Sequence, residues 1–148
     1  MNKENAFSCE DTHTRRPDDA AIIVLAHGSS DPQWREPIDA VVRAIRQRQP
    51  GRLCVCAFIQ HTAPLLGDAV VTLLAEAACQ KREVAHIRIV PLFLGLGLHV
   101  RQDLPELLAQ MQTAHPGVVF SMQAAVSEDA RLIDTLATIA LEPLVARR

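Results

Sequence analysis

Two histidines stand where an apolar run gives way to a glycine-containing loop. His27 follows the run AAIIVLA (residues 20–26), and His99 follows the segment LGLGL (residues 94–98). Neutral imidazole coordinates divalent cobalt, nickel, iron and zinc, and it can also accept a proton near neutral pH. A single histidine at the end of a strand is also compatible with a hydrogen-bonded structural role. Two of them in one place would instead indicate a metal site or a proton-accepting centre.

The segment before the second histidine has the chemistry of a surface for a flat ligand. Gly95 and Gly97 allow backbone conformations that other residues avoid, and they let a ligand approach the main chain. Leu94, Leu96 and Leu98 would supply an apolar floor beside it. A broad apolar surface edged by imidazole suits a large planar ligand that holds or receives a metal ion.

The elements that must position these residues alternate between strand and helix along the chain. Apolar, β-branched runs predict four strands, each followed by apolar residues at helical spacing. The predicted strands lie at residues 20–26, 53–59, 86–94 and 118–122, and the last helix carries Ile133, Leu136 and Ala140. This alternation predicts parallel strands joined by right-handed crossovers. The expected fold class is α/β: a small, doubly wound, mostly parallel four-stranded sheet with helices on both faces.

Sequence signals also predict where three of the helices begin. Asp31 can cap the first helix, with Pro32 at its first position. Thr62 and Pro64 are expected to start the second helix, and the third is expected to begin just after His99. Each of the loops before these helices then follows the carboxyl end of a strand.

Ligands of open parallel sheets bind beyond the carboxyl ends of the strands, near the point where the strand order reverses. His27 follows the first predicted strand, and residues 95–99 follow the third. Gln60 and His61 follow the second. Adjacent strands lie about 4.8 Å apart, so side chains at these ends can converge on one ion or substrate. A sheet of so few strands also has edges where a partner chain could bind.

The composition is that of one globular domain. Of the 148 residues, 49% are hydrophobic and 22% are charged. A chain of this length and hydrophobic content can bury an apolar core. We expect residues 20–148 to form a single domain and residues 1–19 to form a disordered tail. A net charge of −2, one Trp and no Tyr give no basis for binding nucleic acid.

No association with a membrane is expected either. No apolar run approaches the ~20 residues that span a bilayer, and residues 1–20 lack the apolar centre of a signal peptide. The four cysteines form no CxxC pair, and Cys54 and Cys56 are expected on one face of a strand. A reducing, cytoplasmic environment is therefore the expectation.

Several familiar catalytic motifs are absent from the sequence. It has neither a GxxxxGK[ST] loop nor a GxGxxG segment after the first strand, so no nucleotide is expected. Without a GxSxG elbow, Ser29 and Ser30 are weak candidates for hydrolase nucleophiles. A histidine phosphatase would carry Arg before the strand-end histidine, where this chain has Ala26. That alternative stays open without support from the sequence.

Three segments together resemble a known family. The segment AHGSSDPQW (residues 26–34), Pro64 after the second strand, and VPLFLGLGLHVRQDLPELL (residues 90–108) are similar to the small CbiX-type, class II chelatases that act on sirohydrochlorin. The resemblance runs from about Ala21 to Leu141. It implies a chelatase-like, flavodoxin-related fold in which one copy is half of a larger bilobal enzyme. Small members would then work as homodimers that hold the tetrapyrrole between or within the paired lobes.

The resemblance also implies an activity and roles for residues. The activity, of the lyase class, would be ATP-independent insertion of cobalt, nickel or ferrous iron into sirohydrochlorin or a related tetrapyrrole, on the route to cobalamin or sirohaem. His27 would accept protons and bind the metal, His99 would be the second ligand, and residues 94–98 would line the macrocycle. Pyrrole N–H protons must leave before the ion enters, so a base near the ring is required. A pair of imidazoles, with water at the other positions, would hold the ion loosely enough to release it.

One position departs from the family pattern. Many members carry Glu shortly after the second strand, where this chain has Gln60 within FIQHTAP. Glutamine has a similar shape but neither takes a proton nor places a negative charge beside an ion. His61 follows it, and successive strand residues point to opposite faces. The sequence leaves two functions open: a chelatase with Gln60 against the substrate, or a tetrapyrrole- or metal-binding carrier of the same fold without turnover.

Overall fold

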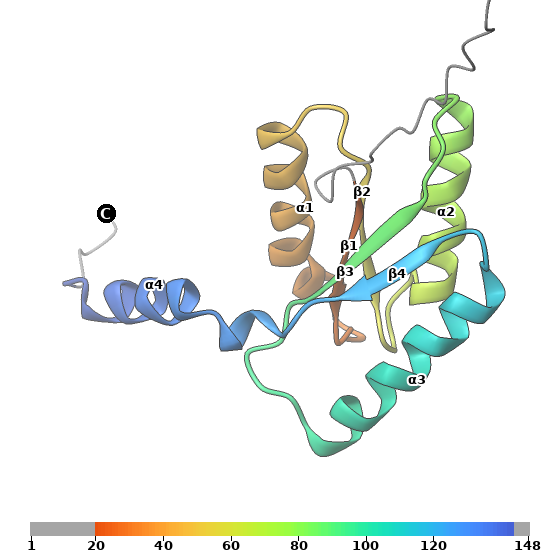
Figure 1. The fold of residues 1–148 in the computed structure, drawn as a ribbon. Coiled ribbons are helices and arrows are strands. Elements are labelled where there is room, and N and C mark those ends of the chain that lie inside the picture. Colours follow the sequence, from red (N-terminus) through yellow and green to blue (C-terminus); the bar gives the residue numbers. More distant parts are fainter. Residues whose placement is uncertain (1–19, 144–148) are drawn as a thin grey trace, which may run out of the picture.

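The computed structural model describes residues 20–143, which form a four-stranded sheet with helices on both faces (Figure 1). The strands are β1 (Ala21–Ala26), β2 (Cys54–Phe58), β3 (His86–Pro91) and β4 (Val119–Met122). Neighbouring strands are all parallel, in the order β2-β1-β3-β4. The doubly wound α/β fold predicted from the sequence is confirmed, and the sheet is entirely parallel. The tail predicted at residues 1–19 lies outside the described residues.

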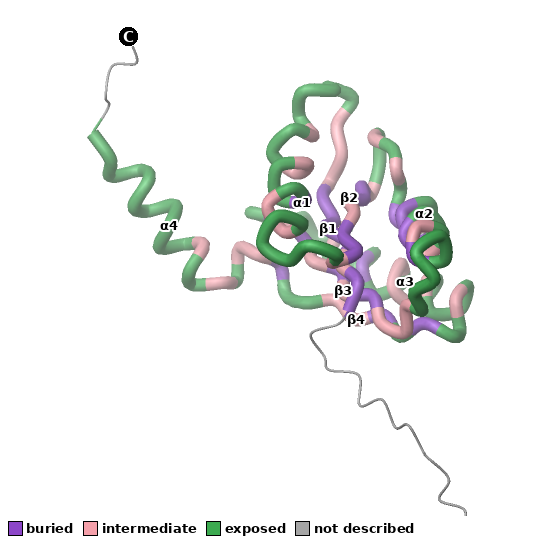
Figure 2. Tube along the Cα trace, turned by 90° about the horizontal axis from the view of Figure 1, so that it is seen from above, coloured by how far each residue is buried: buried purple, intermediate pink, exposed green. Residues whose placement is uncertain are grey.

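The helices are unevenly distributed around the sheet. They are α1 (Glu36–Arg48), α2 (Leu66–Cys79), α3 (Leu98–Ala114) and α4 (Ala130–Leu141), with short 3₁₀ turns η2 (Pro32–Arg35) and η3 (Val126–Glu128). The first of them, α1, lies on one face, and α2 and α3 lie on the other (Figure 1). The last helix, α4, projects away from the sheet and covers neither face (Figures 1 and 2). None of the helices in residues 20–143 is both long and apolar enough to pass through a bilayer.

Each face of the sheet has its own apolar core. On the α2–α3 side, Ile23, Leu25 and Ile89 are fully buried, and the inner residues of both helices pack against them. On the α1 side, a smaller cluster contains Val24 and Phe58. Burying an aliphatic side chain of this size contributes about 1.5–3 kcal/mol. The sheet is therefore a rigid platform for the loops at its carboxyl end.

The predicted helix start is confirmed at the first helix and wrong at the second. The Asp31 carboxylate accepts a backbone N–H of η2 (2.9 Å), and Pro32 follows at the first helical position. The chain then continues from η2 into α1. By contrast, α2 begins at Leu66, not at Thr62 or Pro64. The Thr62 hydroxyl is bonded to a neighbouring loop and caps no helix.

The third helix begins before His99 rather than after it, so that prediction was also wrong. The first residue of α3 is Leu98, and the Arg101 N–H bonds the Gly97 carbonyl (3.1 Å). The backbone at Gly97 is extended (φ −63°, ψ 153°), which suits the N-cap position. His99 therefore lies within the first turn of α3, where the helix fixes its backbone.

Candidate functional site

The carboxyl ends of β1, β2 and β3 meet at one rim of the sheet. Ala26 of β1 pairs with Phe58 of β2, and Leu25 of β1 pairs with Pro91 of β3. The three strands therefore end at nearly the same level. His27 leaves β1 at this rim, where the loops that follow β2 and β3 also begin. The strand order reverses beside β1, so this rim is the switch point at which open parallel sheets bind ligands.

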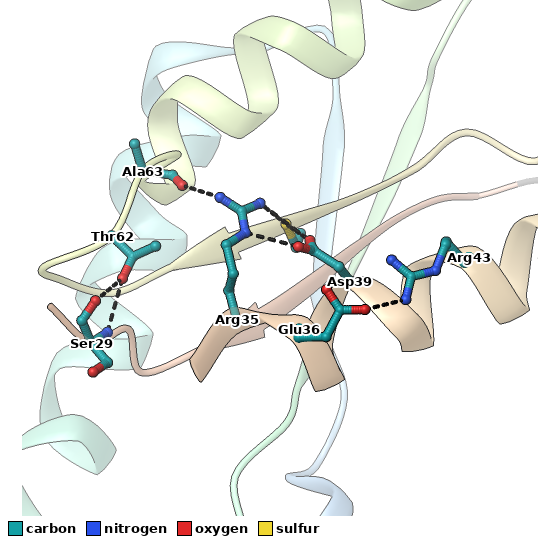
Figure 3. A network of polar contacts seen from close by, with 8 residues as sticks. Ser29, Arg35, Glu36, Asp39, Arg43, Thr62 and Ala63 are labelled. Carbon is teal, nitrogen blue, oxygen red and sulfur yellow. Dashed lines mark hydrogen bonds and ion pairs between the residues drawn. The ribbon is translucent and has the colours of Figure 1, made fainter. Parts of the chain in front are cut away.

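Hydrogen bonds tie the loop after β1 to the loop after β2. The His27 carbonyl accepts the Gln60 N–H (3.1 Å). Further along, the Thr62 hydroxyl donates to the Ser29 carbonyl (2.6 Å) and accepts the Ser29 N–H (2.9 Å), as Figure 3 shows. These bonds fix the main chain at and beyond His27, so its ring extends from a defined position.

Gly28 is required by the close approach of these two loops. Its φ is +96°, in the region that side-chain-bearing residues avoid. A Cβ added at Gly28 would lie 1.7 Å from the Gln60 carbonyl oxygen. No side chain fits there, because the obstructing atom belongs to the backbone. The glycine of the AHG segment therefore lets the two loops stay bonded beside His27.

The imidazole of His27 is held by packing rather than by hydrogen bonds. It is half-buried, and its centroid lies 4.4 Å from that of the Phe93 ring, with the two planes tilted by 50°. Phe93 is only 1% exposed and belongs to the loop after β3. Within residues 20–143 the imidazole makes no hydrogen bond. Every fully buried side-chain nitrogen or oxygen in that range has a hydrogen-bond partner, so the unbonded nitrogens of the His27 ring are not fully buried. The ring nitrogens thus remain open to solvent, which favours a ligand- or proton-binding role over a structural one.

The loop between β3 and α3 presents apolar surface to solvent. Leu94 and Leu98 are 69% and 66% exposed, whereas Leu96 is half-buried and packs against the core. His99 is exposed beside them in the first turn of α3. Leu94 and Leu98 thus expose apolar side chains to solvent on this loop.

The two glycines of this loop do not use the conformational freedom that the sequence suggested. Neither Gly95 nor Gly97 has a positive φ. A Cβ at either position would meet no atom within 4 Å. The expectation of a special backbone was wrong, because Gly97 serves as an extended N-cap instead. The space beside both residues is open, as close approach of a flat ligand requires.

Gln60 and His61 lie in a turn beyond the end of β2. Both are exposed, and His61 has a left-handed backbone (φ 64°). Because β2 ends at Phe58, the strand alternation that would send His61 to the opposite face does not apply. Gln60 is placed close to His27 through its backbone hydrogen bond.

The two predicted metal ligands, His27 and His99, are not part of a larger cluster of ligating side chains in the described residues. Within residues 20–143, no three His, Cys, Asp or Glu side chains are grouped so that they could hold one ion. His27 comes from the end of β1 and His99 from the start of α3. An ion at this rim would take its other ligands from water, from its acceptor or from a second chain, as in open rather than structural sites.

Comparison with known proteins identifies the family. The family model described as CbiX matches residues 21–142, nearly the whole described part of the chain. The chain belongs to the CbiX family. The resemblance in the sequence of the rim segments is thereby confirmed.

Curated relatives of this CbiX family member are named sirohydrochlorin cobaltochelatases. The protein of Methanococcoides burtonii is 29% identical over 87 residues, which cover 59% of this chain and 62% of that protein. The protein of Priestia megaterium is 27% identical over 105 residues, covering 71% of this chain and 32% of that protein. The matched segment thus spans less than two thirds of each of these relatives.

Solved structures share the fold. One of them is a protein from Marinobacter aquaeolei VT8 that is described as a cobalamin (vitamin B12) biosynthesis CbiX protein. It matches with a TM-score of 0.65 and 26% sequence identity, and the match covers 82% of this chain and 93% of that chain. The sirohydrochlorin chelatase SirB from Bacillus subtilis subspecies spizizenii, solved in complex with cobalt, matches with a TM-score of 0.64 and 21% identity. That match covers 80% of this chain and 48% of SirB.

Arg35, whose role the sequence did not indicate, links two segments at the rim of this CbiX family member. The Arg35 guanidinium donates to both carboxylate oxygens of Asp39 (2.8 and 3.2 Å), which lowers the pKa of Asp39 and raises that of Arg35. It also donates to the Ala63 carbonyl (3.2 Å) and lies 5.5 Å from the centroid of the Phe58 ring (Figure 3). Arg35 therefore ties the start of α1 to the loop that carries Gln60.

The two cysteines of β2 are structural. Burial raises the pKa of the Cys54 thiol to about 11, and burial together with a hydrogen bond to Asp39 raises the pKa of the Cys56 thiol. Both lie in the core cluster beneath α1, as predicted for residues on one strand face. Protonated, buried thiols are poor metal ligands near neutral pH.

Proposed function

We propose that this CbiX family member catalyses ATP-independent insertion of a divalent metal ion into sirohydrochlorin, a lyase reaction of cobalamin or sirohaem biosynthesis. The proposal depends chiefly on one observation. The imidazole of His27 is fixed at the switch-point rim by Phe93, with its nitrogens free of structural partners. Relatives in the same family carry the name sirohydrochlorin cobaltochelatase.

His27 would act as the proton acceptor and as a metal ligand. Insertion requires loss of two pyrrole N–H protons, and a neutral imidazole within hydrogen-bond reach of the macrocycle can accept one at a time and pass each on to water. The bond between its carbonyl and Gln60, together with the packing on Phe93, holds the ring in place without occupying a nitrogen. Such a preorganised base needs no rearrangement when the substrate arrives.

His99 and the leucines beside it would receive the metal and the pigment. Leu94 and Leu98 offer exposed apolar surface for one face of the macrocycle, with Gly95 and Gly97 allowing close approach. His99 would be the second metal ligand, and Gln60 would contact the substrate through its amide. The ion is a substrate here: cobalt, nickel or ferrous iron would suit two imidazoles completed by water.

We further propose that the protein works as a homodimer in the cytoplasm. The chain aligns with 48% of SirB, so two copies would supply a matching pair of lobes. The open ligand set of one copy also suits a site completed by a second chain. Cys54, Cys56 and Cys79 are free thiols, and Cys79 is exposed, which suits a reducing compartment.

The alternative of a non-catalytic tetrapyrrole or metal carrier is favoured by one feature, Gln60. An amide at this position neither accepts a proton nor attracts a cation. A carrier would bind the pigment at the same rim without accelerating insertion.

The decisive test is an anaerobic insertion assay. Purified protein is mixed with sirohydrochlorin and Co²⁺, Ni²⁺ or Fe²⁺, and the visible spectrum is followed against a protein-free control. We expect acceleration that is lost in His27→Ala and retained in His115→Ala, because His115 lies at the far end of α3. Pigment binding without acceleration by the wild-type protein would support the carrier instead.

A further inference from the structure

The turn that follows β2 holds a histidine in a strained backbone conformation. His61 has a positive φ of 64°, and the Thr62 N–H bonds the Gln60 carbonyl across it (2.8 Å). A three-residue turn closed in this way over a residue with positive φ is the classic γ-turn, which is rare and strained. Glycine adopts positive φ without steric cost, whereas a histidine keeps such a conformation only where the surrounding structure holds it. Residues held in this way are concentrated at functional sites.

Hydrogen bonds on both sides of His61 hold the turn against the loop that carries His27. On one side, the Gln60 N–H donates to the His27 carbonyl (3.1 Å). On the other side, the Thr62 hydroxyl bonds both the N–H and the carbonyl of Ser29 (2.9 and 2.6 Å), as Figure 3 shows. The bonds that fix the main chain at His27 therefore also maintain the strained turn at His61.

The imidazole of His61 is available for chemistry. The residue is exposed, and within residues 20–143 its ring makes no hydrogen bond, ion pair or ring contact. The carbonyl carbon of Gln60, which is bonded to the His61 nitrogen, would lie 3.0 Å from a Cβ added at Gly28. The His61 side chain therefore leaves the main chain close to the residue that follows His27.

Secondary structure does not account for the strain at His61, as it does at the other non-glycine residue with positive φ in the described chain. That residue is Lys81 (φ 55°), which follows α2. The Lys81 N–H bonds the Ala78 carbonyl (3.0 Å), and the Arg82 N–H bonds the Ala77 carbonyl (2.9 Å). These two bonds form a Schellman motif, in which a left-handed residue ends a helix. His61 ends no helix, so its conformation serves the rim itself.

We propose that His61 is a second proton acceptor for metal insertion, working beside His27. Two pyrrole N–H bonds break and the two nitrogens bind the divalent ion, so one ion enters for every two protons that leave. With His27 alone, the first proton must pass to water before the second can be taken. A second imidazole takes the other proton, and both rings then return their protons to water. This inference rests on the proposed function, and it assigns proton transfer rather than metal binding to His61, in keeping with the absence of a three-ligand cluster within residues 20–143.

The first test compares variants that keep the turn. His61→Asn retains a side chain that tolerates positive φ but accepts no proton. We expect its single-turnover rate of Co²⁺ insertion to fall about tenfold, with pigment affinity unchanged. His61→Gly should relieve the strain and raise the Tm, yet insert metal as slowly as His61→Asn, and added imidazole should restore part of its rate. Lys81→Gly is the matched control, because it also relieves a positive φ and should raise the Tm without changing the rate.

Two results of these rate measurements would overturn the role of His61. One is insertion by His61→Asn at the wild-type rate. The other is a loss of rate in His61→Gly that imidazole does not restore. Either result, obtained with an active wild-type protein, would reject this inference and leave the proposed function standing.

The second test needs no turnover. The protein is treated with diethyl pyrocarbonate, with and without bound sirohydrochlorin and in the absence of metal, and modified histidines are identified by mass spectrometry. The pigment should slow modification of His61 and leave that of His115, at the far end of α3, unchanged. Modification of His61 at the same rate with and without pigment would place this residue outside the site and overturn the inference. A wild-type protein whose His61 is protected but which inserts no metal would instead reject the proposed function, and the proton transfer with it.

Discussion

The contact between the loops after β1 and β2 gives the sharpest prediction, because Gly28→Ala should disrupt it. A Cβ at Gly28 would lie 1.7 Å from the Gln60 carbonyl oxygen, so one loop must move by roughly 1.5 Å to restore ordinary contact. The positive φ adds a strain of about 1–3 kcal/mol, and losing the Gln60–His27 hydrogen bond adds about 1 kcal/mol. We therefore expect Gly28→Ala to lower the free energy of unfolding by about 2–4 kcal/mol. Displacing the base by this distance should also slow insertion on the order of 100-fold.

The assays are urea unfolding and the anaerobic insertion rate. Gly51→Ala is the matched control, since Gly51 also has a positive φ (86°) but its added Cβ would meet nothing within 4 Å. It should lose about 1 kcal/mol from strain alone and keep its activity. Equal destabilisation by Gly28→Ala and Gly51→Ala, with insertion unaffected in both, would refute the argument that backbone contact with Gln60 positions the rim.

Four further predictions concern the residues around the rim. Thr62→Val should cost about 1–3 kcal/mol in urea unfolding, because it removes both hydroxyl bonds to the neighbouring loop; Thr62→Ser should recover most of the loss. Asp39→Asn should lower stability by less than about 1 kcal/mol near pH 7, since the ion pair with Arg35 is partly exposed. Since the folded pKa of Asp39 is lowered, its contribution is present above the ordinary carboxyl value of 3.8 and is lost as the pH falls below it, so the wild type and Asp39→Asn should converge in acid-unfolding curves. Mass spectrometry after iodoacetamide treatment near pH 8 should find Cys54 unmodified in the folded protein, because burial holds its pKa at about 11. Gln60→Glu should raise the insertion rate by about tenfold or more if the missing carboxylate limits proton transfer; an unchanged rate would show that the amide is no handicap.

The fold was predictable because its signals are local. The β-branched run that forms β1 and the helical spacing after it needed no long-range information. The same pattern placed His27 and the loop after β3 at carboxyl ends of strands, and the parallel register then brings those ends to one rim. Asp31 followed by Pro32 correctly marked the first helical turn for the same reason.

What the sequence did not reveal depends on contacts between distant segments. Thr62 resembled a helix cap, but its hydroxyl bonds Ser29, which is 33 residues away. Phe93 belonged to an apolar run, and nothing local indicated that its ring supports His27. The apolar residues of α4 had the spacing of any core-facing helix, yet this helix covers neither face of the sheet, because spacing does not say which surface a helix will cover. The signal that could have found Gly28 is its position directly after a strand-end histidine, since a glycine there often permits close backbone approach.

The central claim is that the imidazole of His27 accepts protons from the macrocycle during metal insertion. The most direct measurement is the single-turnover rate of Co²⁺ insertion into protein-bound sirohydrochlorin for the wild type, for His27→Ala, and for His27→Ala with added imidazole. We predict a large loss of rate in the variant and partial recovery with imidazole, while pigment binding is retained. A variant that inserts cobalt as fast as the wild type would contradict the account.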